Sequence, residues 1–186
     1  MADPRLLRIL ALACHDLRTP LATVSGFAKT LTRLGGLDEP QAHFVETIDA
    51  AAEEMALLID DLGVLARIES GTWDPVLAPA DTVELATSSN PRVETNGEGV
   101  VIETAAPALS RALAALALAA ARHGEVERVS WTVNGREFAL EPVNAAAAPV
   151  VTGQELRDLG AAIAWRVVEA LGGSLALDGE TLFVRL

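Results

Sequence analysis

Hydrophobic residues between positions 10 and 31 recur in alternating steps of four and three. This spacing is typical of an α-helix that packs in a bundle. The residues that carry it are Leu10, Cys14, Leu17, Leu21, Val24, Ala28 and Leu31. Gly35 and Gly36 predict the end of this helix, because glycine readily adopts the left-handed conformation of a helix C-terminus. Asp38 and Gln41 have the spacing of a capping box, which predicts that a second helix begins here.

The second helix carries the same alternation of steps. Its apolar positions are Phe44, Ile48, Ala51, Met55, Leu58, Leu62 and Leu65. Two long helices joined by a short loop form an antiparallel hairpin. A single hairpin of this kind leaves an apolar stripe without a partner. We therefore expect a homodimer whose two hairpins make a four-helix bundle.

The turn formers of residues 69–75 end the hairpin, and the pattern beyond them changes. A strand is predicted at 100–103 and helices are predicted at 108–122 and 154–171. Two β-hairpins are predicted with turns at Asn134-Gly135 and Asp178-Gly179, which are favoured turn pairs. The chain is thus expected to be α+β: a helical hairpin in residues 1–70, then a reduced α/β domain in residues 71–186.

Composition excludes several function classes. The 186 residues carry a formal net charge of −12, so the chain has no basic footprint for nucleic acid or for anionic lipid. Cys14 is the only cysteine, which excludes an internal disulfide and a cysteine-based zinc cluster. Residues 1–10 lack the features of a signal peptide, and the apolar run 113–121 is too short to span a bilayer. We expect a cytoplasmic protein without a sensor segment of its own. His43 and His123 have no partner at ligand spacing and are expected to be surface residues.

The chemistry-bearing residues of the first helix cluster around His15. This histidine follows Cys14 and therefore lies on the flank of the bundle. Asp16 is adjacent, and Thr19 lies one turn later on the same face. A carboxylate can hold one ring N–H while the other nitrogen attacks, and a hydroxyl can orient water for the reverse hydrolysis. Pro20 removes a backbone hydrogen bond just beyond. The pattern suits phosphoryl transfer through histidine, although a plain surface histidine gives the same spacing.

The string HDLRTPL at 15–21 resembles the H-box of sensor histidine kinases. The resemblance covers residues 4–70, the dimerisation and phosphoacceptor part of that family. It implies that His15 is phosphorylated and that Asp16 activates it. It also implies that Thr19 supports dephosphorylation of a response regulator, whose receiver domain Arg18 and Ala22 would contact.

The second domain is similar to the ATP-binding domain of the same family. Gly160, Ala162 and Ile163 match its glycine-containing box at the last helix, while Asp158 stands where the first glycine of that box is expected. Two asparagines of the family that hold magnesium and phosphate are replaced by alanines, Ala115 and Ala119. Neither alanine can ligate a metal or donate a hydrogen bond to phosphate.

Two other nucleotide-binding features of the family are missing. Glu141 stands near the expected aspartate of a DxGxG box, but no glycine pair follows it. The stretch between that strand and the last helix is also too short for a lid over ATP. The resemblance therefore implies a degenerate ATPase-like domain with no cofactor and no metal of its own.

Three functions remain open from the sequence. The first is a phosphorelay histidine phosphotransferase that passes phosphate between His15 and receiver-domain aspartates, similar to stand-alone phosphotransfer proteins that keep a kinase-like fold. The second is a divergent ATP-dependent histidine autokinase. The third is a non-catalytic pseudokinase that binds or sequesters a response regulator or a kinase, or that acts as a phosphatase of its partner.

Overall fold

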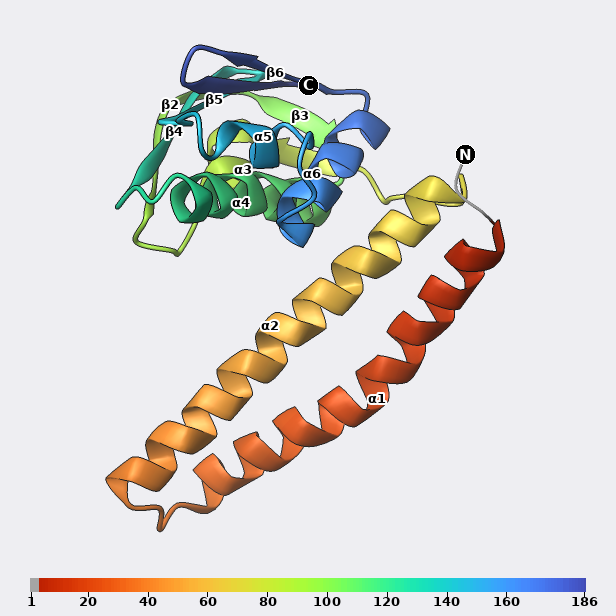
Figure 1. The fold of residues 1–186 in the computed structure, drawn as a ribbon, viewed down its shortest axis with the longest axis vertical. Coiled ribbons are helices and arrows are strands. Elements are labelled where there is room, and N and C mark those ends of the chain that lie inside the picture. The colour runs from red at the N-terminus through yellow and green to blue at the C-terminus, as the bar shows by residue number, and fades with distance from the viewer. Residues whose placement is uncertain (1–3) are drawn as a thin grey trace. The chain divides into compact units, whose positions relative to one another are not determined.

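A computed structural model describes residues 4–186 of the chain. Contacts divide it into two compact units, one that ends at Trp73 and one that begins at Asp74. The first is a helical hairpin and the second is a mixed α/β domain (Figure 1). The predicted fold class, a hairpin followed by a reduced α/β domain, is confirmed. Within residues 4–186, no helix has both the length and the apolar content that a bilayer crossing needs.

The hairpin consists of α1 (Pro4–Leu34) and α2 (Glu39–Glu69). Gly35 and Gly36 between them have φ angles of 69° and 78°, in the left-handed region that glycine enters without a steric penalty. The predicted capping box is present: the Gln41 backbone N–H donates to Asp38 Oδ1 at 2.9 Å, and the Asp38 N–H donates to Gln41 Oε1 at 3.2 Å. The loop and the cap together fix where α2 begins.

Only part of the predicted apolar pattern is buried inside the hairpin. On α1, Cys14 and Ala28 are buried, while Leu17, Val24 and Leu31 are exposed. On α2 the buried residues lie one position after members of the predicted stripe, and most of that stripe is exposed. Those buried residues are Val45, Ala52, Ile59, Gly63 and Ala66. The physical reason is that α1 and α2 cover one side of each other, and the remaining stripe has no partner within a single hairpin.

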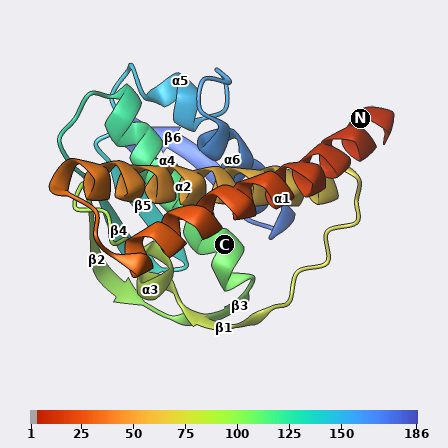
Figure 2. The same cartoon turned by 90° about the horizontal axis from the view of Figure 1, so that it is seen from below.

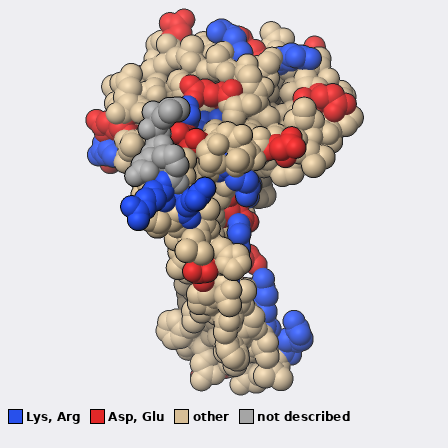
Figure 3. Space-filling view, turned by 90° about the vertical axis from the view of Figure 1, so that its right-hand side faces the viewer, with Lys and Arg blue, Asp and Glu red and all other residues tan. Residues whose placement is uncertain are grey.

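Polar side chains tie the two helices together near the loop. Ser25 donates a hydrogen bond to Asp49 at 2.8 Å, and Lys29 donates one to Glu53 at 2.9 Å. The Glu53 hydrogen bond, helped by the charges of Asp49 and Glu53, raises the pKa of the Lys29 ammonium above its ordinary 10.5. Basic side chains are spread along one visible side of the hairpin (Figure 3). Because the Lys29–Glu53 pair is solvent-exposed, it adds little stability and mainly fixes the register of the helices.

The second unit is a sheet covered by helices. Its five-stranded sheet has the order β2-β4-β5-β7-β6, in which only the β2–β4 pair is parallel, and β1 and β3 form a separate antiparallel pair (Figure 2). The strands are β1 (Ala78–Asp81), β2 (Val93–Gly99), β3 (Val101–Thr104), β4 (Val129–Gly135), β5 (Glu137–Glu141), β6 (Ser174–Asp178) and β7 (Thr181–Arg185). The helices are α3 (Thr82–Ala86), α4 (Ala106–His123), α5 (Ala148–Val151) and α6 (Leu159–Ala170).

The core of this unit lies between the sheet and α4. Leu109, Leu113 and Leu116 of α4 are fully buried. Trp131 of β4 is also fully buried and meets Phe138 of β5 edge to face, with ring centroids 6.3 Å apart. Alternate residues of β4 and β5 are buried, as expected for strands that present one face to a helical layer. This core holds α4 and α6 in fixed positions.

Two details of the sequence prediction are wrong in this unit. Both hairpin turns lie one residue later than predicted, at 135–136 and 179–180, because Asn134 and Asp178 are still paired with the neighbouring strands. Gly135 and Gly179 thus occupy the first turn position, with φ angles of 61° and 59°. The last helix begins at Leu159 and not at residue 154, because the Asp158 side chain caps it there.

The end of α4 offers a test of backbone strain. Glu125 follows the C-cap of α4 with a φ angle of 51°, a left-handed conformation that costs a side-chain-bearing residue free energy. We expect Glu125→Gly to raise the free energy of unfolding of this unit by roughly 0.5–1 kcal/mol, measured by urea titration. Glu125→Ala, which keeps the β-carbon, should give no such gain. An equal gain in both variants would show that the carboxylate, not the backbone, is the source of strain.

Candidate functional site

His15 lies on the exposed flank of α1, as its position next to buried Cys14 predicts. Its side chain is 78% exposed, and its Nδ1 lies 3.1 Å from Asp16 Oδ1. A carboxylate at this distance favours the tautomer with the proton on Nδ1, because the carboxylate only accepts hydrogen bonds. The lone pair then lies on Nε2. The helix therefore presents a nucleophilic nitrogen to solvent, where a large partner can reach it.

The rest of the predicted site follows along the same helix. Thr19 and Ala22 are exposed and lie one and two turns beyond His15, so the three residues share a face of α1. Pro20 has no N–H and cannot bond the carbonyl of Asp16. Despite this, α1 continues without interruption to Leu34. The side chains of Thr19 and Ala22 beside His15 are thus small and uncovered within the hairpin.

Arg18 is engaged inside the hairpin. Its Nη2 and Nε donate to Asp60 Oδ1 of α2 at 2.7 and 3.1 Å. Both side chains are about half exposed, at 49% and 46%. Arg18 therefore joins α1 to α2 one turn below His15, a contact that the sequence pattern did not indicate. About half of the Arg18 side-chain surface still faces solvent, so the predicted contact with a partner remains a proposal.

The second unit places an unexpected ionic cluster at the N-terminus of α6. Asp158 caps this helix by accepting from the Ala161 N–H at 3.1 Å. Its other oxygen lies 3.1 Å from Arg122 Nη1 and 3.3 Å from His123 Nε2, both at the end of α4. The carboxylate is only 9% exposed. His123, which was predicted to be a surface residue, is partly buried: its side chain is 20% exposed and pairs with Asp158 at the N-terminus of α6.

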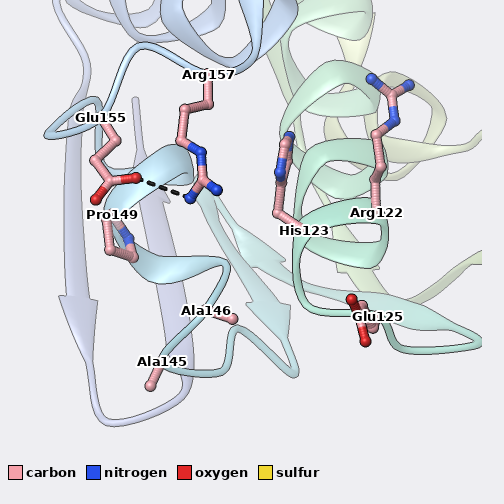
Figure 4. Close-up of a pocket in the computed structure, with 8 residues that line it drawn as sticks. All are labelled: Arg122, His123, Glu125, Ala145, Ala146, Pro149, Glu155 and Arg157. Atoms are coloured by element: carbon pink, nitrogen blue, oxygen red, sulfur yellow. Dashed lines mark hydrogen bonds and ion pairs between the residues drawn. The ribbon is translucent and has the colours of Figure 1, made fainter.

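A pocket of about 420 Å³ opens beside this cluster (Figure 4). Figure 4 shows His123 on α4 and Arg157 in the segment before α6 on opposite sides of it. Arg157 pairs with Glu155 at 3.0 Å, and His123 pairs with Asp158. The remaining lining residues are Arg122, Glu125, Ala145, Ala146 and Pro149. The basic side chains of the pocket are thus already paired with Asp158 and Glu155. The pocket therefore offers an additional anion little net attraction.

The two alanines singled out from the sequence lie on the side of α4 that faces α6. Ala119 is buried, and a β-carbon placed on Gly160 of α6 would lie 3.2 Å from the Ala115 β-carbon. The helices therefore meet through small side chains that carry no polar atom. Among the described residues, no group of three histidine, cysteine or carboxylate side chains could hold a metal ion.

Asp158 lends itself to a stability test. We expect Asp158→Ala to lower the free energy of unfolding by about 1–2 kcal/mol, since it removes the cap and leaves His123 without its partner. Asp158→Asn keeps an oxygen that can cap the helix and should lose less. Urea unfolding of both variants measures the difference. Equal losses would mean that the charge, and not the cap, holds the N-terminus of α6.

Comparisons with known proteins agree on the hairpin. The His Kinase A (phospho-acceptor) domain family matches residues 5–71. The probable sensor histidine kinase TcrY of Mycobacterium tuberculosis is 38% identical over 64 residues, which are 34% of this chain and 14% of that protein. The sensor histidine kinase TrcS of the same organism is 38% identical over 72 residues, 38% of this chain and 14% of that protein. The chain therefore matches only a small part of the length of these relatives.

Comparison with solved structures extends the likeness to the second unit. Full-length ShkA, crystallised in complex with AMPPNP, matches with a TM-score of 0.64 and 23% sequence identity. The match covers 98% of this chain and 45% of that one, and at this identity it speaks for the fold alone. Residues 5–71 thus match the His Kinase A (phospho-acceptor) domain family, and the fold of the unit that follows them resembles the ATP-binding domain of histidine kinases.

Proposed function

We propose that this chain is a phosphorelay histidine phosphotransferase. It takes a phosphoryl group from the aspartate of one receiver domain onto His15 and passes it to the aspartate of another, without ATP. The observation that carries the proposal is an exposed histidine, with a carboxylate at its Nδ1, in the part of the chain that matches a phospho-acceptor domain family. In the second unit, by contrast, the N-terminus of α6 is already capped by Asp158.

The chemistry at His15 follows from the hydrogen bond to Asp16. The Nε2 lone pair attacks the phosphorus of a receiver phosphoaspartate and forms the P–N bond. The P–O bond to the aspartate breaks, and its electron pair stays on the released carboxylate. The Nδ1 proton remains shared with Asp16, which stabilises the positive charge that develops on the ring. The return step to a second aspartate reverses these changes, so no other reactant is needed.

Two features of the second unit support a phosphate source other than ATP. A helix N-terminus attracts phosphate because its free N–H groups point outward. At α6 the Asp158 carboxylate already accepts one of these N–H groups, and it would repel a phosphate electrostatically. The positions that hold magnesium and phosphate in the resembling family are Ala115 and Ala119, which offer neither a ligand nor a donor.

The unpartnered apolar stripe of the hairpin supports a homodimer as the working form. Leu17, Val24 and Leu31 recur every seven residues along α1 and are all exposed. Ile48 and Met55 on α2 are also seven residues apart and exposed. Two copies that cover these stripes form a four-helix bundle, as the heptad spacing favours. The flank with His15 stays outside the bundle and available to a receiver domain.

A relay between two receivers tests the proposal. One receiver domain is charged with radiolabelled acetyl phosphate, freed of the donor and mixed with this chain and a second, larger receiver. The expected result is label that passes through this chain to the second receiver. Label that reaches the second receiver equally well without this chain, or that never appears on this chain with any receiver of a panel, would contradict the proposal.

A further inference from the structure

Two guanidinium groups cover a glycine on α2 beside the phosphoacceptor region. Gly63 lies within α2 and is buried. A β-carbon on Gly63 would lie 3.7 Å from Arg18 Nη2 and 3.9 Å from Arg67 Nη1, and no other atom comes within 4 Å except the helix's own backbone and the adjoining residues. Two arginine side chains, one from each helix, therefore converge beside Gly63.

The Arg18–Asp60 hydrogen bonds show that Gly63 lies at the same position along the hairpin axis as His15. Because the helices are antiparallel, a step toward the start of α1 corresponds to an equal step toward the end of α2. From Arg18 to His15, and from Asp60 to Gly63, the step is three residues, or about 4.5 Å along each axis. His15 and Gly63 therefore lie at the same position along the hairpin axis. Along this axis Arg18 lies on one side of them, and Arg67, four residues after Gly63, lies on the other side.

The charges at this point do not balance. Arg18 is paired with Asp60, whereas the Arg67 guanidinium has no hydrogen-bond or ion-pair partner among residues 4–186. Two like charges that converge on one point repel each other, and an anion placed between them removes that repulsion. Guanidinium groups also match phosphoryl oxygens with paired N–H donors. The two guanidinium groups therefore have the charge and the donor geometry of a binding site for a phosphoryl group.

We propose that Arg18 and Arg67, above Gly63, bind the oxygens of the phosphoryl group while it moves to or from Nε2 of His15. This inference rests on the proposed function and adds Arg67 to the residues that serve it. In phosphoryl transfer most of the negative charge is spread over the three non-bridging oxygens, and fixed cations stabilise it. Arg67 and Gly63 stand outside the H-box string, so that string alone does not indicate them.

The first test measures transfer rates from a labelled receiver to His15. Arg67→Ala is expected to slow transfer by roughly ten- to hundred-fold, the cost of one charged hydrogen bond. Arg67→Lys should recover part of the rate, because it restores the positive charge without the paired donors. The control is Arg33→Ala, which removes an exposed arginine at the far end of α1 and should leave the rate unchanged. Equal rates for Arg67→Ala and Arg33→Ala would overturn the inference.

The second test needs no receiver and uses inorganic phosphate. Nuclear magnetic resonance should show a saturable shift of the Gly63 amide in the wild type and its loss in Arg67→Gln. A shift that persists in Arg67→Gln would contradict the proposed role of Arg67 in binding phosphate. The outcomes also separate the two proposals. If transfer occurs at the same rate with and without Arg67, the phosphotransferase function stands and the Arg18–Arg67 binding site is refuted. If phosphate binding depends on Arg67 but no transfer occurs, the binding site stands and the phosphotransferase function is refuted.

Discussion

Replacing His15 with glutamine is expected to abolish phosphoryl transfer completely. Glutamine is close in size and polar, but its amide nitrogen has no available lone pair with which to form a P–N bond. The helix should remain intact, because the side chain is 78% exposed. The measurement is acid-labile label on the chain after mixing with a charged receiver, in wild type and variant. We expect no label above background in His15→Gln.

The matched control is His43→Gln, which changes an exposed histidine on α2 in the same domain. It should take up label at the wild-type rate. Receiver binding, measured by calorimetry, should be almost unchanged in His15→Gln. If the wild type binds a receiver but is never labelled, and His15→Gln binds equally well, the chain is a sequestering protein and the phosphotransferase proposal fails.

Charges placed in the exposed apolar stripe are expected to convert a dimer into monomers. Val24 and Met55 are 45% and 47% exposed in the single chain. Burying an apolar side chain of this size contributes about 1.5–3 kcal/mol, and two-fold symmetry counts every position twice. Val24→Asp with Met55→Asp should therefore weaken the dimer by roughly 100-fold or more. Light scattering across a range of protein concentrations measures the change.

The control for this experiment is Thr30→Asp with Ala50→Asp. Both positions are exposed on the hairpin but lie outside the stripe. This pair adds the same charge and should leave the dimer intact, while circular dichroism verifies that all variants keep their helices. A wild type that stays monomeric at every concentration, or a dimer that tolerates Val24→Asp with Met55→Asp, would contradict the four-helix bundle.

The hairpin was predictable because its signals are local. Heptad steps and the Asp38–Gln41 capping box act within a few turns, so the sequence alone indicated both helices and the loop. Which half of the apolar pattern is buried inside one hairpin was not predictable. Steps of four and three identify an apolar side of each helix but not the neighbour that covers it. The exposed Leu17 and the buried Cys14, both members of the predicted pattern of α1, show that division.

The site was predictable to different degrees for the same reason. The position of His15 beside Asp16 follows from adjacency along one helix. The partners of Asp158 and the convergence on Gly63 depend on residues that the fold brings together from distant positions. Arg122 meets Asp158 across 36 residues, and Arg18 meets Asp60 across 42. Because such long-range contacts cannot be derived from the sequence, His123 was predicted to be a surface residue without a partner. For the same reason the predicted start of α6 lies five residues too early.

We expect His15 to receive its phosphate from another protein and not from ATP. The most direct measurement offers the purified chain the two sources separately, radiolabelled ATP with magnesium and a radiolabelled receiver domain, and follows label on His15 over time. The expected result is label from the receiver, none from ATP, and none from either source in His15→Gln. Label from ATP that depends on His15 would contradict it.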